Sequence, residues 1–239
     1  MIGFVLVVLV GVPSTLYYSL RILWAAFRKS DTLPCRCHEL PRRWARLLLR
    51  VTGTRVEMEN PERIVPDRPQ ILVVNHVSYF DVLALLGYLP GKSRFVGKKE
   101  LTRVPVWGPA WMACGHISID RKDKIKAMES LAQAQRKLAE DRPTVVLFPE
   151  GTRSVTGELR ACKKGAFVLA IQTGTEVVPA AILGTHEIMH KGSLAIRRGR
   201  TIRVRFGAPI PVERLRMGDR DELTRRAHDA VAALQRLPG

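Results

Sequence analysis

Short runs of β-branched and apolar residues recur along most of the chain after Thr54, and segments with helical periodicity separate many of them. This alternation is typical of a sheet covered by helices, because connecting helices bury the strands. We therefore expect an α/β fold with a mixed, largely parallel sheet flanked by helices. The expected strands are 55–59, 71–75, 94–96, 117–120, 144–148, 176–182 and 201–206. The expected helices are 79–89, 124–140, 164–173 and 220–237.

An uncharged segment, residues 2–20, lies near the start of the chain, and the apolar character continues to Phe27 after Arg21. The segment is long enough to cross the hydrocarbon core of a bilayer. It lacks a basic stretch before Phe4 and a small-residue cleavage site after it, so we expect it to be retained. Pro13 and Arg21 interrupt the segment, which leaves both a spanning helix and a helix lying in one leaflet open.

A second segment, residues 40–51, sets apolar side chains on one helical face and Arg43, Arg46 and Arg50 on another. This pattern fits a basic helix at a membrane interface and equally a helix packed on the core. We expect residues 1–52 to form N-terminal membrane-anchoring helices ahead of an α/β domain at 53–239. If the first helix spans, the arginines that follow it place the domain at the cytoplasmic face of the cell inner membrane.

The chain is strongly basic: its 239 residues carry a formal charge of +17, which predicts an anionic partner. Aromatic residues make up only 6% and no nucleic-acid-binding motif is present, so we expect no nucleic-acid partner. Many of the basic residues follow closely after the apolar segment, which favours binding to anionic lipid headgroups.

The four cysteines are too sparse for a disulfide framework, and Cys35 and Cys37 have no second ligand pair at zinc-site spacing.

Asn75-His76-Val77-Ser78-Tyr79-Phe80-Asp81 follows directly after an expected strand. Ser78 is a good N-cap residue with Asp81 three positions on, so His76 would lie in the loop and Asp81 in the first helical turn. A carboxylate bonded to one ring nitrogen fixes the tautomer and leaves the other nitrogen to accept a proton. Taken alone, the pair could equally be a capping Asp beside an unrelated His.

Phe148-Pro149-Glu150-Gly151-Thr152-Arg153-Ser154 also follows an apolar strand. Gly151 permits close approach of the backbone to a ligand, and Arg153 offers a planar fork suited to phosphate. Two further blocks are Gly115-His116-Ile117-Ser118-Ile119-Asp120-Arg121, and Val177-Val178-Pro179 in an expected edge or terminal strand that tolerates proline.

Together and in order, these blocks resemble the lysophosphatidic acid acyltransferase family, which has an N-H-x4-D box, a G-x-x-x-I-D-R box, an F-P-E-G-T-R-S box and a V-P box. The resemblance covers about residues 71–182. It implies an acyl donor carried on coenzyme A or acyl carrier protein, with no metal and no covalent acyl-enzyme. It also implies a pair of N-terminal helices that lie on the membrane.

The resemblance assigns a role to individual residues of this chain. His76 would be the general base and Asp81 its orienting partner. The residues that would bind the acceptor phosphate or shape its pocket are Lys98, Arg121, Glu150, Gly151, Thr152 and Arg153. Ala180 stands where the family commonly has valine after the proline, which predicts an altered acyl tunnel.

The implied reaction is transfer of a fatty acyl group to 1-acyl-glycerol-3-phosphate, which gives phosphatidic acid. Three alternatives remain open: another lysolipid acceptor such as lyso-ornithine lipid, a non-catalytic protein that binds anionic membranes, and a cysteine-dependent acyl carrier or hydrolase using Cys114 or Cys162.

Overall fold

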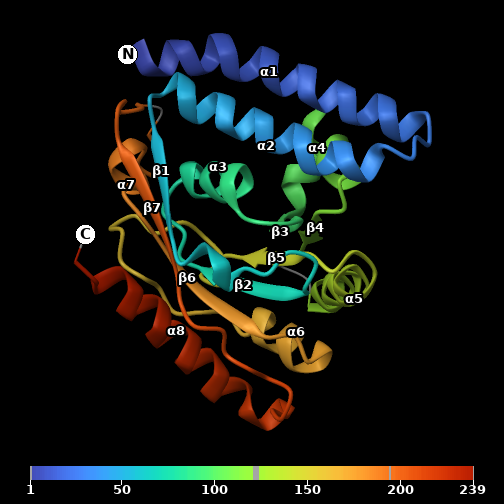
Figure 1. The fold of residues 1–239 in the computed structure, drawn as a ribbon, viewed down its shortest axis with the longest axis vertical. Helices are drawn as coiled ribbons and strands as arrows, with labels where there is room; N and C mark the ends of the chain where they lie inside the picture. The colour runs from blue at the N-terminus through green and yellow to red at the C-terminus, as the bar shows by residue number, and fades with distance from the viewer. Residues whose placement is uncertain (1, 121–123, 194, 239) are drawn as a thin grey trace.

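A seven-stranded sheet forms the centre of the computed structural model, which describes residues 2–120, 124–193 and 195–238 (Figure 1). The strand order is β1-β7-β6-β2-β5-β3-β4, and every pair is parallel except β6 with β7. The strands are β1 (Arg55–Glu59), β2 (Gln70–Val74), β3 (Ser93–Lys98), β4 (Ile117–Ile119), β5 (Thr144–Leu147), β6 (Val177–Leu183) and β7 (Thr201–Phe206). The expected mixed, largely parallel α/β fold is confirmed.

Helices cover both faces of the sheet, and α1 and α2 lie outside α3 on one side (Figure 1). The helices are α1 (Ile2–Phe27), α2 (Leu33–Val51), α3 (Tyr79–Tyr88), α4 (Trp107–Ala113), α5 (Lys124–Asp141), α6 (Gly165–Thr173), α7 (Thr185–Ile188) and α8 (Arg220–Arg236). The expected elements agree with these bounds to within one or two residues. The second N-terminal helix starts at Leu33, earlier than the pattern predicted, and α4 and α7 were not predicted.

The middle strand β2 shows why the sheet is buried on both faces. Successive side chains of a strand point to opposite faces. Leu72 and Val74 pack with α3 on one face, while Ile71 and Val73 pack with α5, α6 and α8 on the other. All four side chains are fully buried. A continuous apolar run is therefore the pattern expected of a central parallel strand.

Pro179 lies inside the sheet, so the expectation of an edge strand was wrong: β6 lies between β7 and β2. The backbone contacts around Pro179 show how an interior strand accommodates a proline. The carbonyl of Pro179 accepts from Gly207 N at 2.7 Å, just after β7 ends, and Val177 exchanges both backbone hydrogen bonds with Ile210. The paired register of β6 with β7 ends at Ala180, so Pro179 lies at the boundary of that ladder and contributes its carbonyl there.

The helix α2 packs on the core, with Leu40, Ala45, Leu48 and Leu49 buried. Arg46 Nε donates to the carbonyl of Gly87 at 2.8 Å, and Arg42 donates to the carbonyl of Leu89. These carbonyls belong to the C-terminal turn of α3, where unpaired acceptors favour cations. Part of the basic face of α2 therefore secures α3, whereas Arg43 and Arg50 remain exposed.

The helix α1 is the outermost element and packs on α2 and α4 (Figure 1). Its outward face carries apolar side chains at intervals of three to four residues. The exposed members are Val5, Val8, Leu9, Val12, Leu16, Tyr17, Leu20, Trp24 and Phe27. Among the described residues, α1 is the helix long and apolar enough to cross a membrane, and only 22% of its Val8–Phe27 window is buried. An apolar face of this size indicates association with a membrane.

We predict that the full chain stays in the membrane fraction through a high-salt wash, because salt does not screen buried apolar area. Leu9→Glu combined with Leu20→Glu should shift it to the supernatant. The matched control is Met217→Glu combined with Leu237→Glu, which adds the same charge at exposed positions far from α1. Quantitative release of the wild type by salt, or continued attachment of the α1 variant, would contradict the assignment of α1 as the anchor.

Candidate functional site

The parallel sheet explains how blocks distant in sequence reach one place. Strands β6, β2, β5, β3 and β4 run in the same direction, so their carboxyl ends share one edge. His76 follows β2, Lys98 ends β3, and the loop 148–154 follows β5. Loops at this edge are where open α/β sheets bind ligands. The side chain of Asn75 joins β2 to β6, accepting from Ile182 N at 2.7 Å and donating to Ile182 O at 3.0 Å.

Asp81 orients His76 through a single oxygen. Its Oδ2 lies 2.8 Å from His76 Nδ1, and it accepts from Val77 N at 2.7 Å and Ser78 N at 2.9 Å. Ser78 is the N-cap of α3, so the predicted capping box is present. Asp81 is fully buried. Because the carboxylate accepts, Nδ1 carries the proton in neutral imidazole, and Nε2 keeps its lone pair.

The loop after β5 holds His76 from the other side. The His76 ring stacks on Phe148 with centroids 4.0 Å apart. Ser154 N donates to the carbonyl of His76 at 2.7 Å. Glu150 Oε1 accepts from His76 N at 2.7 Å, and its Oε2 accepts from Arg160 N at 3.1 Å. The imidazole is thus fixed by both its side chain and its backbone.

Glu150 does not line the cavity described next, although the resemblance placed it in the substrate pocket. Its side chain is buried, and both carboxylate oxygens face backbone N–H groups. Burial raises the pKa of Glu150 above its ordinary value, against the opposing effect of these two donors. The geometry gives Glu150 a supporting position behind His76.

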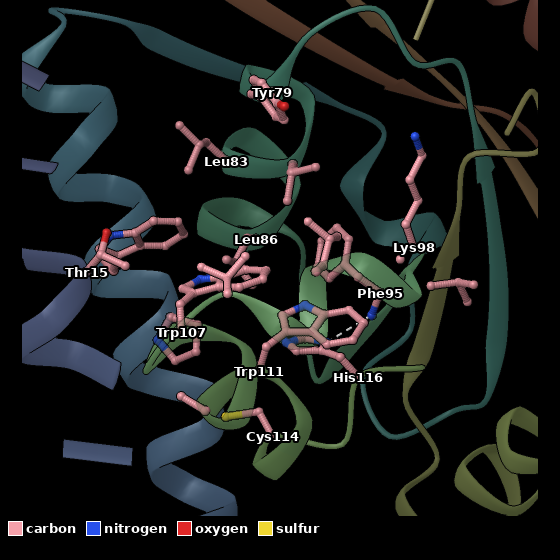
Figure 2. Close-up of a pocket in the computed structure, with 18 of the residues that line it drawn as sticks. Thr15, Tyr79, Leu83, Leu86, Phe95, Lys98, Trp107, Trp111, Cys114 and His116 are labelled. Carbon is pink, nitrogen blue, oxygen red and sulfur yellow. Dashed lines mark hydrogen bonds between the residues drawn. The ribbon is translucent and has the colours of Figure 1, made fainter. Parts of the chain in front are cut away.

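A cavity of about 580 Å³ opens beside His76. Figure 2 shows Tyr79, Leu83 and Leu86 along α3 on one wall, with Phe95, Trp107 and Trp111 lining the same space. Thr15 of α1 and Trp44 of α2 complete the wall, and Trp44 Nε1 donates to Thr15 Oγ1 at 3.0 Å. Most of the lining is apolar, and its cationic side chains gather at one end. Ala180 does not line this cavity but packs in the core against β2, so its small side chain does not widen the cavity directly.

The polar end of the cavity carries cations and, among the described residues, no carboxylate. Lys98 and Arg153 line it, as do Gly151 and Thr152. The Arg153 guanidinium lies 3.9 Å from the centroid of the Tyr79 ring. Arg121 lies outside the described residues. The structure therefore brings Lys98, Gly151, Thr152 and Arg153 together with His76 around one opening.

The backbone conformation at position 151 favours glycine. Its φ of +74° lies in the left-handed region, whereas a Cβ there would meet only the flexible end of the Lys163 side chain, 2.9 Å away at Cε. Any larger residue would strain the loop that carries Thr152 and Arg153.

Lys191 also lines the polar end, and no motif in the sequence indicated it. Its Nζ donates to the carbonyl of Arg153 at 2.8 Å and to Thr152 Oγ1 at 3.4 Å. Lys191 lies beyond the last recognisable block, in an irregular segment after α7. In a chain with 39 Lys and Arg residues, nothing local distinguishes it.

The deep end of the cavity holds two groups that are poor proton acceptors or nucleophiles. His116 is buried, its Nδ1 accepts from Phe95 N at 3.0 Å, and burial lowers its pKa to about 3. A hydrogen bond with the Cys37 thiol, together with burial, raises the pKa of Cys114.

Cys162, the other candidate cysteine, does not line the cavity. Burial raises its pKa to about 11. These shifts disfavour thiolates and count against a cysteine-dependent mechanism.

Comparison with known proteins agrees with the geometry. Residues 55–183 match the Acyltransferase family. The 1-acyl-sn-glycerol-3-phosphate acyltransferase of Cocos nucifera is 32% identical over 168 residues, covering 70% of this chain and 54% of the relative. The 1-acyl-sn-glycerol-3-phosphate acyltransferase alpha of Bos taurus is 32% identical over 188 residues, covering 77% and 64%. The chain thus spans between about half and two thirds of these relatives.

A solved structure resembles nearly the whole chain. The 1-acyl-sn-glycerophosphate (LPA) acyltransferase PlsC from Thermotoga maritima matches with a TM-score of 0.80, covering 99% of this chain and 96% of that one. Its sequence identity is 22%, so this likeness shows the fold. The two N-terminal helices and the seven-stranded sheet are part of the shared architecture. With a family match over residues 55–183 that includes the His76–Asp81 pair and the loop 148–154, the chain belongs to the Acyltransferase family.

Proposed function

We propose that the protein transfers a fatty acyl group from acyl-CoA or acyl carrier protein to the free hydroxyl of 1-acyl-glycerol-3-phosphate, giving phosphatidic acid. The observation that carries the proposal is the arrangement of His76. Its Asp81-oriented ring lies where an apolar cavity meets a cationic opening that has no carboxylate among the described residues. An acyl chain fits the first environment and a phosphate the second. The relatives' names support the same reaction.

In this proposal His76 is the general base. Nε2 takes the proton of the acceptor hydroxyl while the hydroxyl oxygen bonds to the thioester carbonyl carbon. The tetrahedral intermediate then collapses, the carbon–sulfur bond breaks, and the departing thiolate receives the proton from the imidazolium. Asp81 stabilises the imidazolium and keeps the proton-bearing Nδ1 directed away from the substrate. No metal and no covalent acyl-enzyme enters this sequence.

The cationic opening would bind the acceptor phosphate. Arg153 can form two parallel hydrogen bonds to phosphate oxygens, and Lys98 adds a point charge. Thr152 offers a hydroxyl, and Gly151 allows the backbone to approach. We assign Arg121 to the same phosphate from the family resemblance, and Glu150 a supporting role through the His76 backbone.

The N-terminal helices would place the site at the bilayer surface. We assign residues 1–52 to the anchor and 53–239 to the catalytic unit, with Thr15 and Trp44 lining the cavity from the anchor side. The exposed apolar face of α1 fits a helix lying in one leaflet, and exposed Arg43 and Arg50 suit anionic headgroups. We place the protein at the cytoplasmic face of the cell inner membrane.

A second candidate is transfer to another lysolipid, such as lyso-ornithine lipid, because the apolar cavity alone does not select a headgroup. The deciding assay offers lysophosphatidic acid, lysophosphatidylcholine and lyso-ornithine lipid in parallel, each with acyl-CoA and with acyl carrier protein donors. Preference for lysophosphatidic acid is expected from the cationic opening. A non-catalytic membrane protein would transfer nothing and would leave the His76–Asp81 contact without a role.

We predict that His76→Ala lowers the rate of transfer by at least about 10² to 10⁴-fold, the usual effect of losing a general base. Asp81→Asn should also lower the rate of transfer severely, because the Asn amide can donate to Nδ1 and stabilise the tautomer that has its proton on Nε2. The matched control is His228→Ala, which changes a partly exposed histidine of α8; α8 covers the face of the sheet opposite to α3, so this variant should retain activity. A folded His76→Ala protein with most of its activity would contradict the mechanism.

We predict that Arg153→Lys lowers kcat/KM for lysophosphatidic acid by about 10- to 150-fold, because a charge-assisted hydrogen bond is worth about 1.5 to 3 kcal/mol. The KM of the donor should change little. Exposed Arg214→Lys serves as the control for the substitution itself. Separate titrations of acceptor and donor decide the case: an unchanged acceptor KM and kcat with a raised donor KM would move Arg153 to the phosphates of the donor.

A further inference from the structure

The segment between β6 and β7 packs directly on the active-site loops. Thr185 and Ile188 of α7 are buried, and the hydroxyl of Ser78, the N-cap of α3, donates to the carbonyl of Met189 at 2.9 Å. Arg197 N donates to the carbonyl of Ile188 at 2.9 Å and closes the segment on itself. This segment therefore has a fixed position against the start of α3, next to His76.

Two histidines extend the contact to the loop 148–154 and its continuation. His186 Nε2 lies 3.1 Å from the carbonyl of Val155, and His190 Nδ1 lies 3.1 Å from His186 Nε2. The two rings meet edge to face, with centroids 4.3 Å apart. The segment thus contacts the loop on both sides of Ser154: at Val155 through His186, and at Thr152 and Arg153 through Lys191.

Lys191 has the chemistry of an anion ligand. Its ammonium has three N–H donors, and the described residues satisfy two of them, at Arg153 O and Thr152 Oγ1. The side chain is half-buried in the lining of the cavity, and no carboxylate among the described residues lies within ion-pair distance. A partly buried cation without a counter-charge is costly, and an anionic ligand would offset that cost.

We propose that Lys191 is a further ligand of the acceptor phosphate. The proposal rests on the proposed function and adds a residue that lies outside the four sequence blocks. Lys191 would bind a phosphate oxygen with its remaining N–H while its bond to the Arg153 carbonyl holds the backbone that carries the Arg153 guanidinium. A phosphate monoester carries about −1.5 to −2 charges at neutral pH, which Lys98, Arg153 and Lys191 together can match.

A purely supporting role makes a different prediction from direct binding. If Lys191 only held the loop through Arg153 O and Thr152 Oγ1, its loss would disturb every acceptor equally. Direct binding confines the loss to acceptors that bear a phosphate. The comparison of lysophosphatidic acid with monoacylglycerol, which has the same acyl chain and no phosphate, separates the two roles.

The test uses the full chain in vesicles or micelles with acyl-CoA as donor. Lys191→Met should raise the KM for lysophosphatidic acid, lowering kcat/KM by about 10- to 150-fold, with the donor KM unchanged. Lys191→Arg keeps the charge and should recover most of the loss. The matched control is Lys92→Met, which removes an exposed lysine paired with Asp67 outside the cavity. A binding measurement that needs no turnover is the thermal shift: sn-glycerol 3-phosphate should raise the unfolding temperature of Lys191→Met less than that of the wild type.

Each outcome decides the proposal. A normal acceptor KM in folded Lys191→Met, or an equal loss with monoacylglycerol, would overturn it. Should Lys191→Met not fold, Lys191→Gln keeps a donor for the Arg153 carbonyl without the charge and answers the same question. A wild type that fails to use lysophosphatidic acid with either donor would defeat the proposed function itself. A wild type that uses it, with Lys191→Met unimpaired, would defeat only the role of Lys191.

Discussion

The Oδ2 atom of Asp81 is shared by the fold and the candidate site. It accepts from Val77 N and Ser78 N at the start of α3 and lies 2.8 Å from His76 Nδ1. The same carboxylate oxygen therefore caps a helix and orients an imidazole. Because α3 also forms a wall of the cavity, the start of this helix sets both where the proposed base lies and where an acyl chain would lie. Burial of Asp81 excludes water as a competing partner.

The surroundings of His76 divide by polarity in a way that matches an amphipathic substrate. The cavity walls are apolar and include α1 and α2, whereas the opening carries Lys98, Arg153 and Lys191. The hydrogen bond from Trp44 to Thr15 joins the two N-terminal helices at that wall. The element with the apolar outer face thus also builds the site. In the proposed function, this continuity would let a lysolipid reach His76 from the membrane-facing helices.

Local patterns predicted the strands, most of the helices and the His76–Asp81 contact, because strand burial, helical period and capping chemistry are encoded over a few adjacent residues. Features that depend on packing between distant segments were not predicted. Pro179 lies in an interior strand at the end of the β6–β7 pairing, and Glu150 faces backbone N–H groups that only the fold brings near. Lys191 reaches the site through a segment with no motif. The order of the motif blocks, rather than any single block, indicated the family.

The proposed mechanism depends on one protonation state of His76, which ¹⁵N NMR of the histidine side chains measures directly. The His76 signals are assigned by their absence from a His76→Gln sample. For the neutral imidazole of His76 in histidine-labelled protein, we expect a proton on Nδ1 and an unprotonated Nε2. The Asp81→Asn variant should lose this preference. A wild-type His76 with its proton on Nε2 would leave no lone pair directed at the substrate, and it would contradict the role assigned here to Asp81 and His76.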